Sequence, residues 1–593
     1  ISREARLAME EALKAGQLPA LVATGTLELG IDIGSVDLVC QLQSPKSVTR
    51  GMQRVGRSGH LVSRASKGRL FPAFLDDLVE LAVVARGIRE GEVEETRIPK
   101  NCLDVLAQQI VAMVAAEEWD AERLYRLIRQ SYCYQDLPWE LYADVLEMLS
   151  GRYPTGAFRE LRPRLSWDRS SGRLSPMPGS RQLAIVNAGV IPERGYYPVE
   201  LPDGTRIGEL EEEFVFESRV GDAFLLGSQV WRMEEIRPDR VIASLAPGSL
   251  PRMPFWHGET YTRPFELSLK VGAFRRALSS RLDDPGCVEW LQEEYLLDRR
   301  GAAALVSYFR EQREATGVIP SDRTLVLELF ADELGDRRLA VHAPFGGRVN
   351  ALLNLVLARR LREAVGVEVQ SIATDEAILF RFPSSDVPPP LDLLSELSEE
   401  EVMEAVQREL VDTPLFAALF RQCAERALLL PRRSPRRRTP LWLQRLRAGD
   451  LLEAGRRLER FPILLEAYRD ALRDVLDLDG LLHVVRGIAR GEIEVVVVER
   501  HTPSPFARSL WLPFAAVYLY QGDVPRAERQ AQVLAVNREV LEEVLGKRST
   551  EGLLRSEAVE EVTNRLQHTA TGWQARSAYD LLRILRSLGD LSE

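Results

Sequence analysis

The sequence is poor in the residues that build metal sites, disulfides and membrane spans. Its five cysteines are scattered, with no CxxC pair, and its six histidines are equally dispersed. This spacing argues against zinc and iron–sulfur sites and favours a reducing compartment, so we expect a cytoplasmic protein. No long uncharged apolar run occurs, which argues against a transmembrane helix and a membrane partner. We also expect no signal peptide in the first residues, which begin Ile1-Ser2-Arg3.

The chain also lacks an excess of positive charge. Its 88 acidic residues outnumber its 77 lysines and arginines, and the net charge is −11. Composition therefore does not indicate nucleic-acid binding, which would have to come from local basic surface. With 593 residues, of which 45% are hydrophobic and 28% charged, the chain is typical of globular proteins and too long for one core. We expect several domains.

Two short motifs near the start organise the chain. One is LVATGTLELGID, residues 21–32, and the other is QRVGRSGH, residues 53–60. The apolar runs 20–23 and 36–42 predict short buried strands, the first of them followed by a turn rich in threonine and glycine.

A basic helix is expected between the strands and the second motif. Ser47 is suited to cap it, and Arg50, Arg54 and Arg57 are spaced four and three residues apart, so they would share one face. Guanidinium groups beside a strand-end loop suit phosphate, because each offers a rigid fork of donors. The alternative is an ordinary strand–helix unit with a basic surface.

The two motifs resemble motifs V and VI of superfamily 2 helicases. The longer form, TLELGIDIGSVDLVCQLQSP followed by RGMQRVGRSGH, is most similar to the large helicase-related (Lhr) family. In that family the motifs belong to the second RecA-like motor domain. The resemblance implies that Arg54 and Arg57 reach the phosphates of ATP across a cleft between two motor domains, Arg57 as the arginine finger.

The resemblance assigns further residues around the same cleft. Asp32 would contact the ribose, and Gly30 and Gln53 would shape the nucleotide surface. Thr24 or Thr26 would hold a phosphate of the translocating strand. We expect both arginines to face an open cleft beside Asp32 rather than to be locked in ion pairs. His60 is expected to be structural.

Other parts of a motor are missing from the sequence. It contains no GxxxxGK[ST] loop and no DEAD- or DExH-type acidic box, the elements that grip the phosphates and Mg²⁺. We therefore expect a helicase fragment without the first RecA-like domain, in which ATP is the cofactor, Mg²⁺ is held by the missing domain, and the fragment alone is inactive. The alternative is a non-enzymatic nucleic-acid-binding scaffold.

The first 164 residues divide into two expected domains. Residues 1–95 would be the C-terminal part of the second RecA-like domain. Residues 96–164 read as a winged helix, with one apolar stripe running from Leu103 to Val114. A second helix carries three arginines that would follow a phosphate backbone or form a solvated face: Arg123, Arg126 and Arg129.

Residues 165–265 predict a small β-barrel, because short alternating strands are separated by glycine and proline. Trp256 lies in a Pro/Gly loop that would be costly to bury, beside Arg252. It is a candidate to stack on an unpaired base, or alternatively an anchor for the loop. Trp231 is expected in the core.

Residues 266–390 read as an α/β helicase-associated domain with a strand, turn, strand, Gly loop and helix in that order. The loop 342–348 leads into a helix N-terminus, which suits an anion or is simply a turn. Asn350 would cap that helix or reach a phosphate. The pair Asp375-Glu376 stands where the family has paired aspartates, so its role is doubtful.

Residues 391–546 predict a helical helicase-associated region, and 547–593 the start of a further helical module. The helical region contains an arginine-rich segment, residues 432–447, which its prolines hold extended. This segment fits a single-strand groove or is a solvated face. The nucleic-acid candidates in this segment are Arg436, Arg437 and Trp442.

The expected fold is thus multidomain α/β and α+β: a partial RecA-like domain, a winged helix, a small β-barrel, and mixed α/β and helical C-terminal regions. The family implies ATP-driven 3′-to-5′ movement on single-stranded DNA, unwinding of DNA duplexes or RNA–DNA hybrids, and a link to DNA repair. A DEAD-box-like RNA remodeller is disfavoured by the large accessory domains.

Overall fold

A computed structural model describes most of the chain between residues 3 and 510. The residues outside the description are 1–2, 24, 26–27, 29–35, 60–64, 152–161, 192–195, 212–213, 216–217, 227–228, 238–239, 247–261, 332–336, 367–368, 383–389, 395–396, 432, 435–436, 440, 459 and 511–593. None of the helices in the described part is long and apolar enough to cross a membrane.

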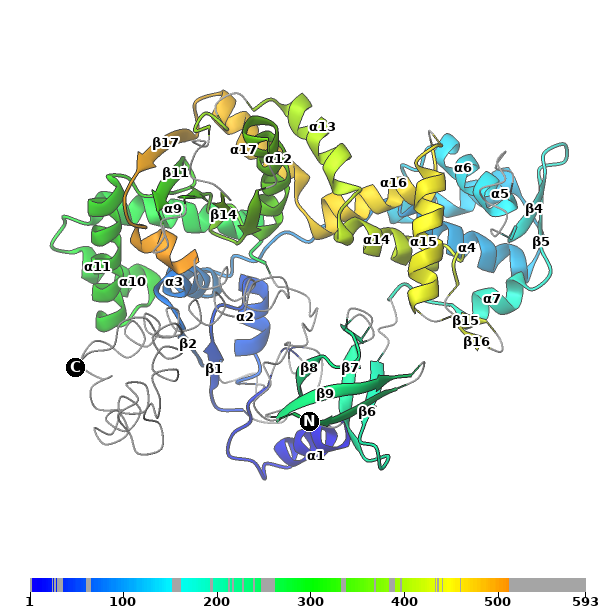
Figure 1. The fold of residues 1–593 in the computed structure, drawn as a ribbon, viewed down its shortest axis with the longest axis horizontal. Helices are drawn as coiled ribbons and strands as arrows, with labels where there is room; N and C mark the ends of the chain where they lie inside the picture. The colour runs from blue at the N-terminus through cyan, green and yellow to red at the C-terminus, as the bar shows by residue number, and fades with distance from the viewer. Residues whose placement is uncertain are drawn as a thin grey trace, which may run out of the picture. The chain divides into compact units, whose positions relative to one another are not determined.

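The N-terminal part pairs two strands between helices (Figure 1). Its elements are α1 Arg3–Lys14, β1 Val39–Leu42, α2 Val48–Val55, β2 Gly68–Phe71 and α3 Leu75–Glu90. β1 runs parallel to β2. The strand expected at 36–42 is confirmed over Val39–Leu42, but the one expected at 20–23 is wrong. Those residues form no strand and Val22 is 96% exposed, because an apolar run becomes a strand only where another strand pairs with it.

The winged helix follows a linker, residues 91–102. Its elements are α4 Leu103–Ala116, β3 Trp119–Asp120, α5 Ala121–Ile128, the 3₁₀ turn η2 Tyr132–Tyr134, α6 Trp139–Ser150, β4 Leu165–Asp168, β5 Arg173–Pro176 and α7 Ser180–Val186. The expected stripe on α4 is buried from Leu103 to Val114. The three strands pair in the order β3-β5-β4, so this sheet joins residues from both sides of residue 164.

The next region is a five-stranded sheet that the small β-barrel prediction does not describe correctly. Its strands are β6 Tyr196–Glu200, β7 Arg206–Glu211, β8 Ala223–Leu226, β9 Gln229–Ile236 and β10 Val241–Leu245, in the order β7-β6-β10-β9-β8. A Cβ on Gly208 of β7 would lie 2.8 Å from Leu226 Cδ2 of β8. The edge strands therefore meet through side chains, and in the described residues no β7–β8 ladder closes the sheet into a barrel. A half-barrel results, with Trp231 buried in its core as expected.

The α/β domain is built on a second five-stranded sheet. Its elements are α9 Phe265–Arg281, α10 Cys287–Tyr295, α11 Arg299–Thr316, β11 Thr324–Ala331, β12 Arg337–His342, α12 Gly347–Val365, β13 Gln370–Ala373, β14 Ala377–Arg381 and, much later in the chain, β17 Glu494–Glu499. The strand order is β13-β14-β12-β11-β17. The strand, turn, strand, Gly loop and helix expected here are confirmed. The parallel pairing of β17 with β11 brings in a strand from the region expected to be helical.

The remaining elements are mainly helical, as expected. They are α13 Glu399–Leu410, α14 Pro414–Arg426, β15 Arg433–Ser434, β16 Arg437–Arg438, α15 Leu441–Gly455, α16 Pro462–Arg469, the π-helical turn η4 Asp470–Val475 and α17 Leu478–Ala489. One hydrophobic core runs through α4 and α6 of the winged helix, α14 and α16, and the inner face of the α/β sheet. The winged helix is therefore packed into the helical region and is not a separate globule.

Candidate functional site

The arginines of the second motif lie on α2 and just beyond it. Ser47 caps the helix as expected, because its Oγ accepts from the backbone N–H of Arg50 at 3.1 Å. The helix ends at Val55, and the N–H of Arg57 reaches the carbonyl of Arg54 at 3.1 Å. Arg50 and Arg54 are one turn apart on α2, whereas Arg57 follows it in the turn, so the prediction of three arginines along one helical face is only partly correct.

A carboxylate from the linker covers the N-terminus of α2. Glu94 accepts from the N–H groups of Val48 at 2.5 Å and Thr49 at 3.0 Å, and from the Thr49 hydroxyl at 2.6 Å. Partial burial would raise the pKa of Glu94, but the hydrogen bonds from Thr49 and Val48 outweigh it and lower the pKa. The linker to the winged helix thus fixes the start of the helix that carries the arginines.

Glu28, in the first motif, contacts both arginines of the second. Its carboxylate forms an ion pair with Nε and Nη2 of Arg54, and its carbonyl accepts from Nη2 of Arg57 at 2.6 Å. Gln41 Oε1, from β1, accepts from Nη1 of Arg54 at 3.0 Å. The structure therefore brings motif V and motif VI into direct contact. The expectation that both arginines are free of ion pairs is wrong for Arg54.

The other expected site residues are described less fully. Gln53 is exposed on α2. Arg437 lies in the hairpin strand β16 and Trp442 in α15, with their side chains outside the description. The remaining candidates lie wholly outside the described residues: Thr24, Thr26, Gly30, Asp32, His60, Arg252, Trp256 and Arg436.

A group of buried and half-buried charges, which we call the seam cluster, was missed by sequence reasoning. It consists of Lys46, Glu80, Arg263, Arg275, Asp375 and Glu376. Arg263 has no exposed surface and donates to Glu80 at 3.1 Å and to Glu376. Lys46 bridges Glu80 at 3.0 Å and Asp375 at 3.1 Å. The only sequence signal was the doubtful acidic pair, which proves to join the α/β domain to the loop before α2.

Asp375 of the same acidic pair occupies the start of α12, where the sequence suited either an anion or a simple turn. Asp375 Oδ1 accepts from the N–H of Gly347 at 2.8 Å and from that of Arg263 at 3.1 Å. Asn350 is buried and donates through Nδ2 to the carbonyls of Ala343 at 2.7 Å and Thr374 at 2.8 Å. The loop therefore serves as a turn held by the protein's own carboxylate, and Asn350 neither caps the helix nor offers its N–H groups to a phosphate.

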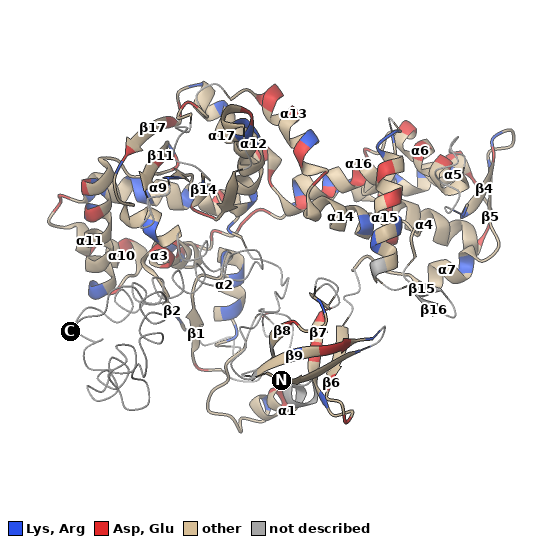
Figure 2. Cartoon of the chain, in the orientation of Figure 1, with Lys and Arg blue, Asp and Glu red and all other residues tan. Residues whose placement is uncertain are grey.

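The arginines of the winged helix lie against their own domain. Arg123 lies over the Trp119 ring at 5.4 Å and Arg129 over the Tyr125 ring at 5.6 Å. Figure 2 shows acidic residues on the adjacent helix α6, where Glu147 pairs with Arg169. Helix α6 would be the groove-reading helix of a winged helix, so its acidic surface favours the structural interpretation of the arginines on α5.

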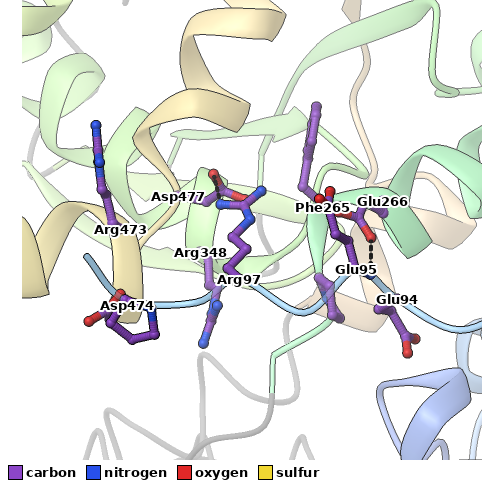
Figure 3. A pocket seen from close by; sticks show the side chains of 11 residues that line it. Glu94, Glu95, Arg97, Phe265, Glu266, Arg348, Arg473, Asp474 and Asp477 are labelled. Atoms are coloured by element: carbon purple, nitrogen blue, oxygen red, sulfur yellow. Dashed lines mark hydrogen bonds and ion pairs between the residues drawn. The ribbon is translucent and has the colours of Figure 1, made fainter. Parts of the chain in front are cut away.

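A cavity of about 350 Å³ lies beside the linker (Figure 3). Arg97 extends across it to Asp477 at 3.3 Å, and the N–H of Glu95 donates to Glu266 at 3.1 Å. Charges of both signs line the cavity and Arg97 pairs with Asp477, so its lining offers no surface of one sign to a ligand. Within the described residues, no three His, Cys, Asp or Glu side chains come together as metal ligands.

Three family models match the chain in order. They are the Helicase conserved C-terminal domain over residues 1–61, the Large helicase-related protein winged helix domain over 86–253, and the DEAD/H associated family over 319–507. The first match contains both arginines and Glu28. The second includes the winged helix together with the half-barrel sheet.

Curated relatives align with most or all of the chain. The Lhr helicase/probable uracil glycosylase of Mycolicibacterium smegmatis is 45% identical over 601 residues, covering 100% of this chain and 40% of the relative. The ATP-dependent helicase Lhr-Core of Methanothermobacter thermautotrophicus is 35% identical over 86% of this chain and 59% of its own length. The chain thus spans about 40% to 60% of these relatives.

A solved structure gives the same relationship. The Mycobacterium smegmatis helicase Lhr bound to single-stranded DNA and AMP-PNP superposes with a TM-score of 0.69 at 42% identity. The match covers 86% of this chain and 61% of that one.

Proposed function

The chain belongs to the large helicase-related (Lhr) family, and we propose that it is the part of a superfamily 2 helicase that completes one side of an ATP site and guides a DNA strand. The observation that carries the proposal is the contact of Glu28 with both Arg54 and Arg57. It unites the two helicase motifs and places the guanidinium groups of Arg54 and Arg57 beside the same residue of the first motif.

The donors of Arg54 fit a nucleotide phosphate. Its guanidinium has five N–H groups, and no described residue besides Glu28 and Gln41 accepts from them. N–H groups of Arg54 therefore remain for a phosphate oxygen. ATP would supply the phosphoryl group whose negative charge these donors meet. Asp32 would hold its ribose, with Gly30 and Gln53 shaping the surface. Mg²⁺ would be held by a domain with the Walker motifs that this sequence lacks.

Single-stranded DNA is the proposed partner, with a DNA duplex or an RNA–DNA hybrid ahead of it. The binding of single-stranded DNA by the related Mycobacterium smegmatis helicase supports this proposal. Movement would be 3′ to 5′, and the biological setting DNA repair. The residues proposed for the strand are Thr24, Thr26, Arg252, Trp256, Arg436, Arg437 and Trp442.

A second candidate is a non-enzymatic nucleic-acid-binding scaffold. The absence of a GxxxxGK[ST] loop from the sequence favours it. The two candidates share the strand-binding surface and differ in whether Arg54 and Arg57 meet a nucleotide.

Two measurements on the protein that contains this chain test the proposal. ATP turnover should be stimulated by single-stranded DNA, and a duplex should be unwound when its single-stranded tail is at the 3′ end and not at the 5′ end. The isolated chain should bind DNA without turning over ATP. ATP turnover by the isolated chain, or unwinding of 5′-tailed substrates only, would contradict the account, and strand binding with no turnover by either protein would favour the scaffold.

A further inference from the structure

We propose that Glu28 and Gln41 are positioning residues, which orient Arg54 for its contact with the phosphates of ATP. The proposal rests on the function proposed above for Arg54 and Arg57. Three segments converge on one guanidinium: Arg54 from α2, Glu28 from the first motif and Gln41 from β1. A free arginine side chain has many rotamers, and contacts on two sides restrict them before the phosphate arrives.

Some N–H groups of the Arg54 guanidinium bond to the protein, and the others are available to bind a phosphate. Glu28 takes the Nε and Nη2 side, and Gln41 takes one N–H of Nη1 at 3.0 Å. The remaining N–H groups of Nη1 and Nη2 are the ones left to a phosphate. The side chain of Arg54 is 22% exposed and that of Glu28 11%, so the ion pair is only weakly screened by water.

The amide of Gln41 is itself oriented by its neighbours. Its Nε2 donates to the carbonyls of Leu42 at 2.9 Å and Gln43 at 3.0 Å. The nitrogen is thereby turned toward the backbone and the oxygen toward Arg54. The amide in this orientation can accept from the arginine but cannot compete with it for the carboxylate.

The position of Glu28 is itself fixed by hydrogen bonds of its backbone N–H and carbonyl groups. Its N–H donates to the carbonyl of Gly25 at 3.1 Å, which closes a turn in the first motif. Its carbonyl accepts from Arg57 at 2.6 Å while its carboxylate holds Arg54. A single residue therefore sets the positions of both arginines relative to the first motif.

Replacement of the holding groups should slow turnover more than it weakens ATP binding. For Glu28→Ala in the full-length protein we expect kcat for DNA-stimulated ATP hydrolysis to fall about 10- to 100-fold, as when the orienting partners of metal ligands are removed. The KM for ATP should change by less than about threefold, because loss of a phosphate contact that is made mainly in the transition state lowers kcat and leaves ground-state binding nearly unchanged. Gln41→Leu should give a smaller loss, and Glu28→Gln, which keeps an acceptor for Nε, a loss between those of Glu28→Ala and the wild type.

A matched control removes a different carboxylate from an arginine in the same part of the chain. Glu90 pairs with Arg86 at 2.9 Å on α3 and touches neither motif, so Glu90→Ala should leave kcat and KM unchanged. If Glu28→Ala does not fold, the nearly isosteric Glu28→Gln and Gln41→Leu provide the same test.

The outcomes separate this proposal from the function on which it rests. Unchanged kcat in the Glu28 and Gln41 variants, with activity lost in Arg54→Ala, would overturn the positioning role and leave the function intact. Full activity in both Arg54→Ala and Arg57→Ala would overturn the function itself. A rise in turnover for Glu28→Ala would mean that Glu28 withholds Arg54 from ATP, which also overturns positioning.

Discussion

Arg263 and Glu376 are two charged residues on whose pairing the stability of the folded protein depends. Arg263 is completely enclosed, yet it is stabilised by Glu80, Glu376 and the Ser268 hydroxyl at 2.9 Å. Burial would raise the pKa of Glu376, but the neighbouring Arg263 and Arg275 outweigh it and lower the pKa to about 2. A buried charge with its partners in place is tolerated, whereas one that loses a partner is costly.

We therefore predict that Glu376→Gln destabilises the chain by about 3 kcal/mol, because it leaves the charges of Arg263 and Arg275 incompletely balanced. The pKa of Glu376 lies below its ordinary value of 4.5, so its stabilising effect is present above about pH 4.5 and is lost as the pH falls toward 2. Urea denaturation across that range measures both effects, and the variant should lose less stability on acidification than the wild type.

The control is Glu363→Gln, which removes an exposed partner of Arg359 on α12. It should cost less than about 1 kcal/mol. Equal stability of the Glu376 and Glu363 variants would show that the seam cluster does not hold the domains together.

For single residues, the sequence indicated which side chains carry the motif better than it indicated their partners. Arg54 and Arg57 could be singled out because motif spacing is local. The partner of Arg54 could not, because Glu28 is separated from it by 26 residues. The seam cluster was missed for the same reason, since its six residues come from positions 46 to 376.

Among the elements, α2 depends most on groups outside itself. It spans only Val48–Val55, too short to be stable alone in water. Ser47 caps it from within the local sequence, and Glu94 covers the same N-terminus from the linker. The element was predictable from its cap and arginine spacing, whereas its second cap was not.

Glu94→Ala should destabilise the packing of α2 by about 1 kcal/mol, the usual cost of losing an N-terminal cap. Amide hydrogen exchange of α2 should speed up accordingly. Glu95→Ala is a close control, because Glu95 donates to Glu266 through its backbone N–H, which the substitution retains. Equal exchange rates in the two variants would argue against a capping role for Glu94.

Elements defined by their own periodicity were predicted well, and those defined by partners were not. The buried stripe of α4 and the strand, loop and helix order of β11, β12 and α12 follow from local pattern. Residues 20–23 had the apolar composition of a strand without the pairing, and β17 pairs with β11, some 170 residues earlier in the chain. Strand pairing depends on distant sequence, which a local pattern does not contain.

For the whole molecule, the domains expected from the sequence share cores. Helix α4 packs with α14 and α16 in one hydrophobic cluster. Arg426 of α14 pairs with Asp104 of α4 and with Asp470 at 2.8 Å. The contact between the winged helix and α14, which joins residues 322 positions apart, could not be predicted from local sequence pattern and required the structure.

The proposed DNA binding is the feature of the whole molecule that is easiest to measure. The net charge of −11 opposes binding, so affinity should depend on local arginines and fall steeply with salt. Trp256→Ala should weaken single-strand binding by about 1–3 kcal/mol at all salt concentrations if the ring stacks on a base. Arg436→Ala should instead reduce the slope of the logarithm of affinity against the logarithm of salt concentration.

Arg457→Ala on the exposed surface is a suitable control for both variants. Trp231→Ala is not, because it alters a core residue of the half-barrel.

Salt-independent binding, or unchanged affinity in both variants, would remove Trp256 and Arg436 from the proposed strand path. Such a result would leave the nucleotide side of the account untouched.

The central claim is that Arg57 acts on the phosphates of ATP from this side of the motor. Single-turnover ATP hydrolysis by the full-length protein, saturated with single-stranded DNA, tests it most directly. Arg57→Ala should slow the chemical step about 10³-fold or more while ATP still binds. Wild-type single-turnover rates in the Arg57→Ala protein would contradict the account.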